Sequence, residues 1–157
     1  MKHEIRLYNM IFPIWLLWMF PPAWLVILPG NLLFDGLVLF LSLTALRRAG
    51  RRDRMRSLLL PFWVCGFLAD FVGVAWMYLG LFISGLSGGW NLYFPLAHPA
   101  AFVWTLSAVA VSGICIYAMD RVILKGETSP LPDREQRVLA LAMAIVTAPW
   151  TFFIPLV

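Results

Sequence analysis

Residues 10–56 read MIFPIWLLWMFPPAWLVILPGNLLFDGLVLFLSLTALRRAGRRDRMR. The first 37 of these residues carry one charged side chain, that of Asp35, whereas the ten that follow carry six arginines. An α-helix needs about 20 apolar residues to cross the roughly 30 Å hydrocarbon core of a bilayer. The contrast therefore predicts membrane-spanning helices that end at a strongly basic loop.

The composition of the whole chain agrees with a membrane location. Of its 157 residues, 62% are hydrophobic and 13% are charged, whereas a soluble domain has about 45–50% apolar and about 25% charged residues. This excludes a water-soluble globular domain, a disordered tail and a secreted scaffold held by disulfides. The two cysteines, Cys65 and Cys115, form no C-x-x-C pair, so thiol–disulfide redox chemistry is not expected.

A turn is expected at Pro29-Gly30-Asn31, because 37 apolar residues are too many for one crossing and a Pro-Gly pair is typical of turns. The sequence then predicts an all-α integral membrane protein, a bundle of five transmembrane helices that forms a single domain over residues 1–157. The predicted helices cover residues 10–28, 31–46, 58–83, 100–119 and 138–157.

The twelve Lys and Arg residues lie in three short segments, at 2–6, 47–56 and 121–137. Cytoplasmic loops of membrane proteins are rich in Lys and Arg, and five crossings bring all three segments to one side. This predicts an N-terminus inside and a C-terminus outside, in a plasma membrane that we expect to be a bacterial inner membrane.

The same charges indicate which partners to expect. They flank apolar segments and form no continuous basic face, so no nucleic-acid partner is predicted. The bilayer itself is the first partner, and the loop Arg47–Arg56 is predicted to face anionic lipid headgroups or an acidic protein. A second copy of the chain, in a homo-oligomer, is a further candidate partner.

Glycines mark a candidate seam between helices. Gly66, Gly73 and Gly80 recur one heptad apart within the predicted helix 58–83. Small residues let neighbouring helices approach closely in lipid, so this face is predicted to contact another helix.

Two aspartates within the apolar segments, Asp35 and Asp70, form the candidate site. A carboxylate at the bilayer centre costs roughly 2.5–3.5 kcal/mol, and therefore faces a partner or a wet cavity. Asn31 and Ser42 share the helix face of Asp35, and no Lys or Arg lies in the apolar segments. We predict that Asp35, Asp70, Asn31 and Ser42 form an ion or proton site, with Asp35 about 6 Å below the outer surface. The alternative is that both aspartates are hydrogen-bonded contacts between helices.

Two tryptophans, Trp15 and Trp18, lie on adjacent faces of the first predicted helix. They are candidates to contact a flat hydrophobic ligand, and the alternative is simple packing in the protein or against lipid.

No catalytic residue, metal site or cofactor is predicted. The chain has no P-loop and no nucleophile with a placed base, and its aspartates stand in Phe34-Asp35-Gly36 and Ala69-Asp70-Phe71 instead of the G-x-G-D motif of intramembrane aspartyl proteases. We therefore expect a small proton- or cation-linked transporter or channel-like protein more than an enzyme. The alternatives left open are a non-enzymatic membrane accessory subunit or assembly factor and, more remotely, an intramembrane enzyme.

Overall fold

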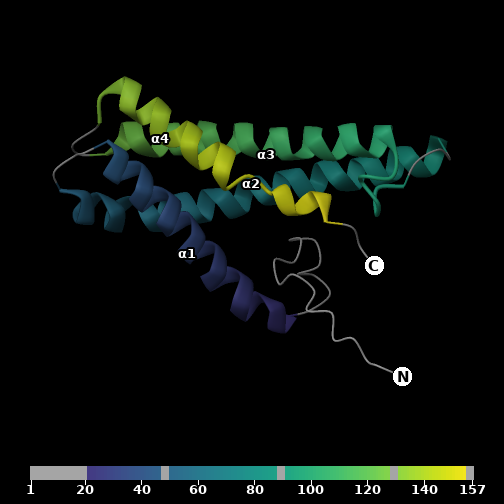
Figure 1. The fold of residues 1–157 in the computed structure, drawn as a ribbon, viewed down its shortest axis with the longest axis horizontal. Helices are drawn as coiled ribbons and strands as arrows, with labels where there is room; N and C mark the ends of the chain where they lie inside the picture. The colour runs from purple at the N-terminus through teal and green to yellow at the C-terminus, as the bar shows by residue number, and fades with distance from the viewer. Residues whose placement is uncertain (1–20, 47–49, 88–90, 128–130, 155–157) are drawn as a thin grey trace.

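A computed structural model describes residues 21–46, 50–87, 91–127 and 131–154. These residues form helices α1 (Pro21–Ala45), α2 (Arg51–Ser87), α3 (Pro99–Gly126) and α4 (Asp133–Val146), followed by the short 3-10 helix η2 (Trp150–Phe153). Helices α2 and α3 run in opposite directions along the long axis, and α1 and α4 are inclined to them (Figure 1). Four helical segments are long and apolar enough to cross a membrane: Leu25–Ala45, Arg52–Gly85, Pro99–Gly126 and Asp133–Phe153. The all-helical fold is thus confirmed, with four such helices in the described residues.

The predicted turn at Pro29-Gly30-Asn31 is wrong, because α1 continues through it with Pro29 inside the helix. Two separate helices would each leave up to about four backbone groups unpaired at the turn, and lipid offers no water to bind them. A continuous helix loses only the one hydrogen bond that proline cannot donate. The predicted helices 10–28 and 31–46 are therefore not a hairpin, and residues 10–20 lie outside the described part.

The end of α3 also differs from the prediction. The helix expected over 100–119 continues to Gly126, so that Asp120 lies within it and the connecting loop starts later. Leu124 is buried in the core while Lys125 is exposed. One helix face therefore remains apolar through this charged segment, which keeps the helix packed against its neighbours.

The last predicted helix, 138–157, is broken. α4 starts earlier, at Asp133, and ends at Val146, and three residues separate it from η2. The hydroxyl and the backbone N–H of Thr147 both donate to the carbonyl oxygen of Met143, each at 2.8 Å. The indole N–H of Trp150 donates to Ile145 O at 2.8 Å. These bonds satisfy carbonyl groups that the end of a helix leaves without partners.

The core is divided between the two ends of the bundle. A larger cluster joins all four helices. Its large, almost fully buried side chains are Leu39, Leu43, Leu58, Phe62, Ile116, Leu124, Leu139 and Met143. A smaller cluster of Ala108, Val109, Ala148 and Phe152 joins α3 to the segment after α4. The first half of α1 diverges from the bundle (Figure 1), and Leu25 there is 80% exposed. The second half of α1 is thus the part that anchors it.

Large apolar side chains also cover the outside of the bundle. Leu33, Ile114 and Val122 are each more than 60% exposed, on α1 and α3. A soluble monomer rarely exposes so much apolar surface, whereas such a surface suits contact with lipid tails. The fold therefore supports a lipid bilayer as the surroundings of this chain.

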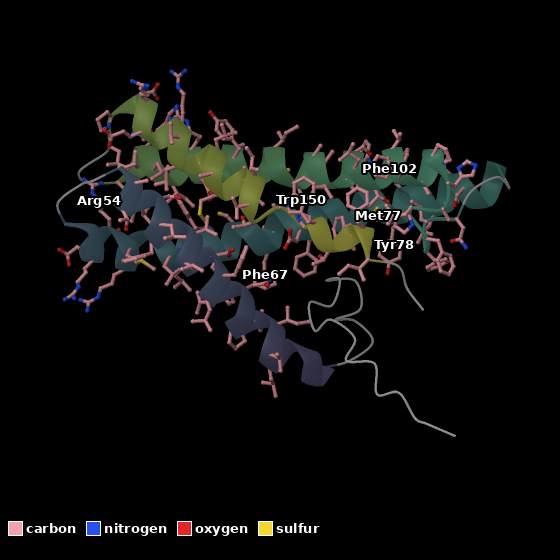
Figure 2. All side chains as sticks on the ribbon, in the orientation of Figure 1. Arg54, Phe67, Met77, Tyr78, Phe102 and Trp150 are labelled. Carbon is pink, nitrogen blue, oxygen red and sulfur yellow. The ribbon has the colours of Figure 1, made fainter. Side chains whose placement is uncertain are left out.

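The basic segments of α2, α3 and α4 lie at one end of the bundle. Figure 2 shows Arg54 there, whereas Met77, Tyr78 and Phe102 lie toward the other end. At the same end Arg121 of α3 forms a 2.7 Å ion pair with Asp133 of α4. We call this the arginine-bearing end.

The predicted glycine seam of α2 is confirmed. An added Cβ at Gly73 would overlap the Ser112 hydroxyl of α3 and the Phe152 ring, and one at Gly80 would overlap the indole of Trp104. Gly66, the third member, faces Asp35 of α1. The glycines thus let α2 pack closely against α1, α3 and η2.

We expect Gly73→Ala to lower the free energy of unfolding by about 1–3 kcal/mol, since the added methyl group overpacks the contact with α3. Gly85→Ala in the same helix is the control, because nothing lies within 4 Å of its added Cβ. Denaturation of the purified protein in mixed detergents measures both. Equal stability of the two variants would contradict close packing at Gly73.

Candidate functional site

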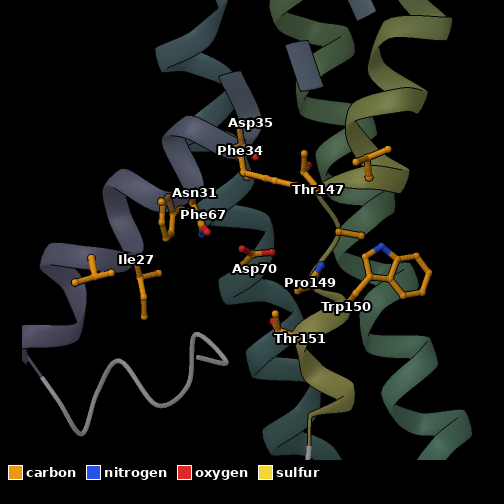
Figure 3. A pocket seen from close by; sticks show the side chains of 15 residues that line it. Ile27, Asn31, Phe34, Asp35, Phe67, Asp70, Thr147, Pro149, Trp150 and Thr151 are labelled. Atoms are coloured by element: carbon orange, nitrogen blue, oxygen red, sulfur yellow. The ribbon is translucent and has the colours of Figure 1, made fainter. Parts of the chain in front are cut away.

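A cleft of about 410 Å³ lies between α1, α2 and the break that follows α4. Asn31 and Asp35 line it from α1, Asp70 from α2, and residues 146–151 from the broken segment. Figure 3 shows Asp70 between Asn31 on one side and Pro149 and Thr151 on the other. The structure therefore brings three of the four predicted site residues to one cleft.

Asp35 reaches this cleft from the middle of α1. Its side chain is 8% exposed, and its Oδ2 lies 3.6 Å from the place that a Cβ on Gly66 would take. The predicted depth of Asp35 assumed a helix that begins at Asn31, and this assumption is wrong because α1 begins at or before Pro21. Ala45, at the end of α1, is ten positions beyond Asp35, or about 15 Å along the helix.

Asp70 shares a face of α2 with Gly66, because it lies four residues, or about 6 Å, further along the helix. Its side chain is 7% exposed, and its buried Oδ1 has no hydrogen-bond partner among the described residues. The preceding carbonyl, Ala69 O, accepts a 3.0 Å bond from the Ser112 hydroxyl of α3. The contact with α3 thus holds this turn of α2 in place while the carboxylate points elsewhere.

Ser42 does not line the cleft, although it shares a face of α1 with Asn31 and Asp35. It lies seven residues beyond Asp35, or about 10 Å along the helix axis, so a common face does not bring it to the same cavity. Trp15 and Trp18, the predicted contacts for a hydrophobic ligand, lie outside the described residues.

The broken end of α4 is a part of the site that sequence reasoning missed. Thr147 and Thr151 flank Pro149 and are half-buried, and all three line the cleft. Unwound backbone beside a membrane cavity supplies carbonyl groups that bind cations in transporters. The signal in the sequence was Thr147-Ala148-Pro149 inside an apolar segment, since proline disfavours helix in the residue before it.

Asp120 was also missed, because it was assigned to a solvated loop. It is 0% exposed in α3, and neither carboxylate oxygen has a hydrogen-bond partner in the described part of the chain. Ile116 and Leu124, one turn before and one turn after it, are also buried. This spacing of four residues was the signal that Asp120 belongs to the inward face of a helix.

The buried carboxylates are close enough to influence one another. Asp35 interacts electrostatically with both Asp70 and Asp120. No Lys or Arg occurs between residues 57 and 120, or between residues 7 and 46. Asp35 and Asp70 thus have no Lys or Arg near them in the sequence, and two negative charges without a cation are strongly unfavourable in an apolar interior. The arrangement is therefore suited to holding protons or a small cation.

Comparisons with protein-family models, with curated proteins and with solved structures found no match for this chain. The described residues place no three His, Cys, Asp or Glu side chains together as metal ligands. What the site can do chemically therefore rests on the geometry of its carboxylates.

We expect Asp70→Leu to leave the free energy of unfolding unchanged or to raise it, since replacing a buried, unpaired charge by an apolar group of similar volume is often neutral or stabilising. Ser112→Ala is the matched comparison, because it removes a buried hydrogen bond to Ala69 O and costs about 1 kcal/mol. Denaturation in mixed detergents measures both variants. A larger loss for Asp70→Leu than for Ser112→Ala would identify Asp70 as a hydrogen-bonded helix contact.

Proposed function

We propose that this chain is a small proton- or cation-linked transporter or channel-like protein, and that Asp35, Asp70 and Asn31 form its ion or proton site. The observation that carries the proposal is that Asp35 and Asp70 enter one cleft from two helices, beside the break after α4. Carboxylates within a membrane are rare, and they mark ion pathways and proton relays.

Three features of the cleft support this function over a purely structural one. Asp70 Oδ1 has no hydrogen-bond partner among the described residues, so the carboxylate does not join α2 to a neighbour through that atom. The cleft is large enough for several water molecules, at about 410 Å³ against about 30 Å³ for each molecule in liquid water. The break after α4 resembles the discontinuous helices that build ion sites in transporters.

We further propose that the arginine-bearing end lies in the cytoplasm of a plasma membrane, most naturally a bacterial inner membrane, by the positive-inside rule. The end of η2 then lies toward the outside, in line with the predicted external C-terminus. Because α1 is one helix, its beginning at Pro21 also lies toward the outside. The proposed internal N-terminus therefore depends on residues 1–20, which lie outside the described part.

A second candidate function is that of a non-enzymatic accessory subunit or assembly factor. Four exposed arginines favour it, namely Arg52 and Arg56 of α2 and Arg134 and Arg137 of α4, all at one end of the bundle. Such a surface suits anionic lipid headgroups or an acidic protein. A homo-oligomer fits either function.

The transport proposal is tested with purified protein in liposomes under a pH gradient, with an internal pH-sensitive dye and with Na⁺ or K⁺ inside or outside. We expect flux from the unaltered protein, and loss of about 90% or more of it in Asp70→Asn and Asp35→Asn, since an amide cannot exchange a proton at this site. The control is Asp53→Asn, which alters an exposed carboxylate at the start of α2.

No flux from the unaltered protein, or equal flux in Asp70→Asn and Asp53→Asn, would contradict transport. If the protein without flux also co-purified with an acidic protein after gentle extraction, the accessory function would be favoured instead.

The orientation is tested by labelling single cysteines on intact cells, after Cys65 and Cys115 are replaced by alanine. We expect a membrane-impermeant maleimide to label Asn91→Cys, in the exposed loop before α3, and not Asp53→Cys until the cells are opened. The reverse pattern would place the arginine-bearing end outside and contradict the proposed orientation.

A further inference from the structure

Asp120 is a buried carboxylate that the cleft does not include. We propose that it is a proton-relay residue, which passes protons between Asp35 in the cleft and the water at the arginine-bearing end. This inference rests on the proposed function and adds to it a route and a transported ion, the proton.

The first support is the burial of Asp120 together with its lack of partners. The side chain is 0% exposed, and both oxygens are without a hydrogen-bond partner among the described residues. A structural carboxylate in an apolar core is held by donors, because an unpaired buried polar group is costly. A carboxylate that takes up and releases a proton needs to keep its oxygens available.

The second support is that the nearest cation in the sequence is bound elsewhere. Arg121 follows Asp120 directly, but its guanidinium donates to Asp133 Oδ1 at 2.7 Å and to Gln136 Oε1 at 3.2 Å. Both acceptors belong to α4. A salt bridge from Arg121 would keep Asp120 in its charged form. The guanidinium binds Asp133 and Gln136 instead and forms no such salt bridge with Asp120.

The third support is the position of Asp120 between the cleft and the end of the bundle. It lies six residues before Gly126 at the end of α3, or about 9 Å along the helix. Ile116 and Leu124, one turn before and one turn after Asp120, pack in the same core cluster as Leu39 of α1 and Phe62 of α2. Leu39 lies one turn beyond Asp35, and Phe62 lies one turn before Gly66, which faces Asp35. Asp120 therefore packs beside the turns of α1 and α2 that lie between the cleft and the arginine-bearing end, and an electrostatic interaction between Asp120 and Asp35 agrees with this placement.

The surroundings offer Asp120 no competing titratable group from α4. The buried residues that α4 presents to the core are Gln136, Leu139, Ala140, Met143 and Ala144. Within the described residues, the ionisable groups near Asp120 include Asp35, Cys65 and Arg121, and Tyr117 lies about one turn before it on α3. Of these, Asp35 is the group that can exchange a proton with Asp120 in the relay.

The step moves one proton without any other change. The carboxylic acid of Asp35 releases a proton through bridging water to the carboxylate of Asp120, which leaves Asp35 as the carboxylate and Asp120 as the acid. Asp120 then gives the proton to water at the arginine-bearing end. Transport in the opposite direction reverses both transfers.

Liposomes with an internal pH-sensitive dye test the relay. We expect Asp120→Asn to lower proton flux by about tenfold or more, and Asp120→Glu, which retains a carboxylic acid, to restore part of it. Asp53→Asn, at the same end of the bundle but exposed, is the control and should retain full flux. Size-exclusion chromatography identifies any variant that does not fold. The fluxes of Asp120→Glu and Asp120→Asn are then compared at equal amounts of folded protein per liposome.

A second measurement does not depend on proton flux. Infrared difference spectra record the protonation of buried carboxyl groups after a pH jump on one side of the membrane. In oriented liposomes, Asp120→Asn should slow protonation of the remaining buried carboxyl groups from the arginine-bearing end and not from the opposite side. Full flux and unchanged spectra in folded Asp120→Asn would overturn the relay and leave the cleft proposal standing. Absence of proton flux in the unaltered protein, with cation flux that depends on Asp70, would overturn the proton route alone.

Discussion

The rest of the structure depends on the exclusion of water from the apolar interior of the bilayer, because backbone groups there must find partners within the chain. Pro29 remains inside α1, since a turn at that point would leave more groups unpaired than one missing donor does. Where α4 does end, Thr147 and Trp150 donate to the carbonyl groups of Met143 and Ile145. One constraint thus explains both a proline that does not end its helix and a break that is stabilised by its own side chains.

The exclusion of water also makes a buried charged side chain an indication of function, because burying it without a partner is costly. Arg121 is half-buried, but it reaches Asp133 and Gln136 of α4 near the end of the bundle. Asp35, Asp70 and Asp120 are more fully buried. Asp35 and Asp70 lie in parts of the sequence without Lys or Arg, and the Arg121 guanidinium beside Asp120 in the sequence binds α4 instead. A carboxylate in such surroundings is retained against a free-energy cost. This is the physical reason for treating these aspartates as functional groups.

The sequence predicted the apolar helices correctly, because composition alone identifies them. It failed at the ends of helices and at prolines, where a helix meets a polar or irregular segment. Asp35 and Asp70 were expected in one cavity, and they share the cleft. Asp120 was assigned to a solvated loop because the segment 120–137 is polar and contains two prolines, although Ile116, Asp120 and Leu124 are spaced for one buried face. Ser42 was included because periodicity reports which face a residue occupies and says nothing of its distance along the helix.

Hydropathy and the grouping of the arginines were sufficient to establish long apolar helices and basic segments that gather at one end, because these properties follow from the solvent and need no knowledge of contacts. Which helices meet, where α4 breaks and which segments each aspartate faces were decided by packing. Gly73 admits Ser112 and Phe152, and Gly66 faces Asp35. These contacts join residues far apart in the chain, and no local pattern specifies them.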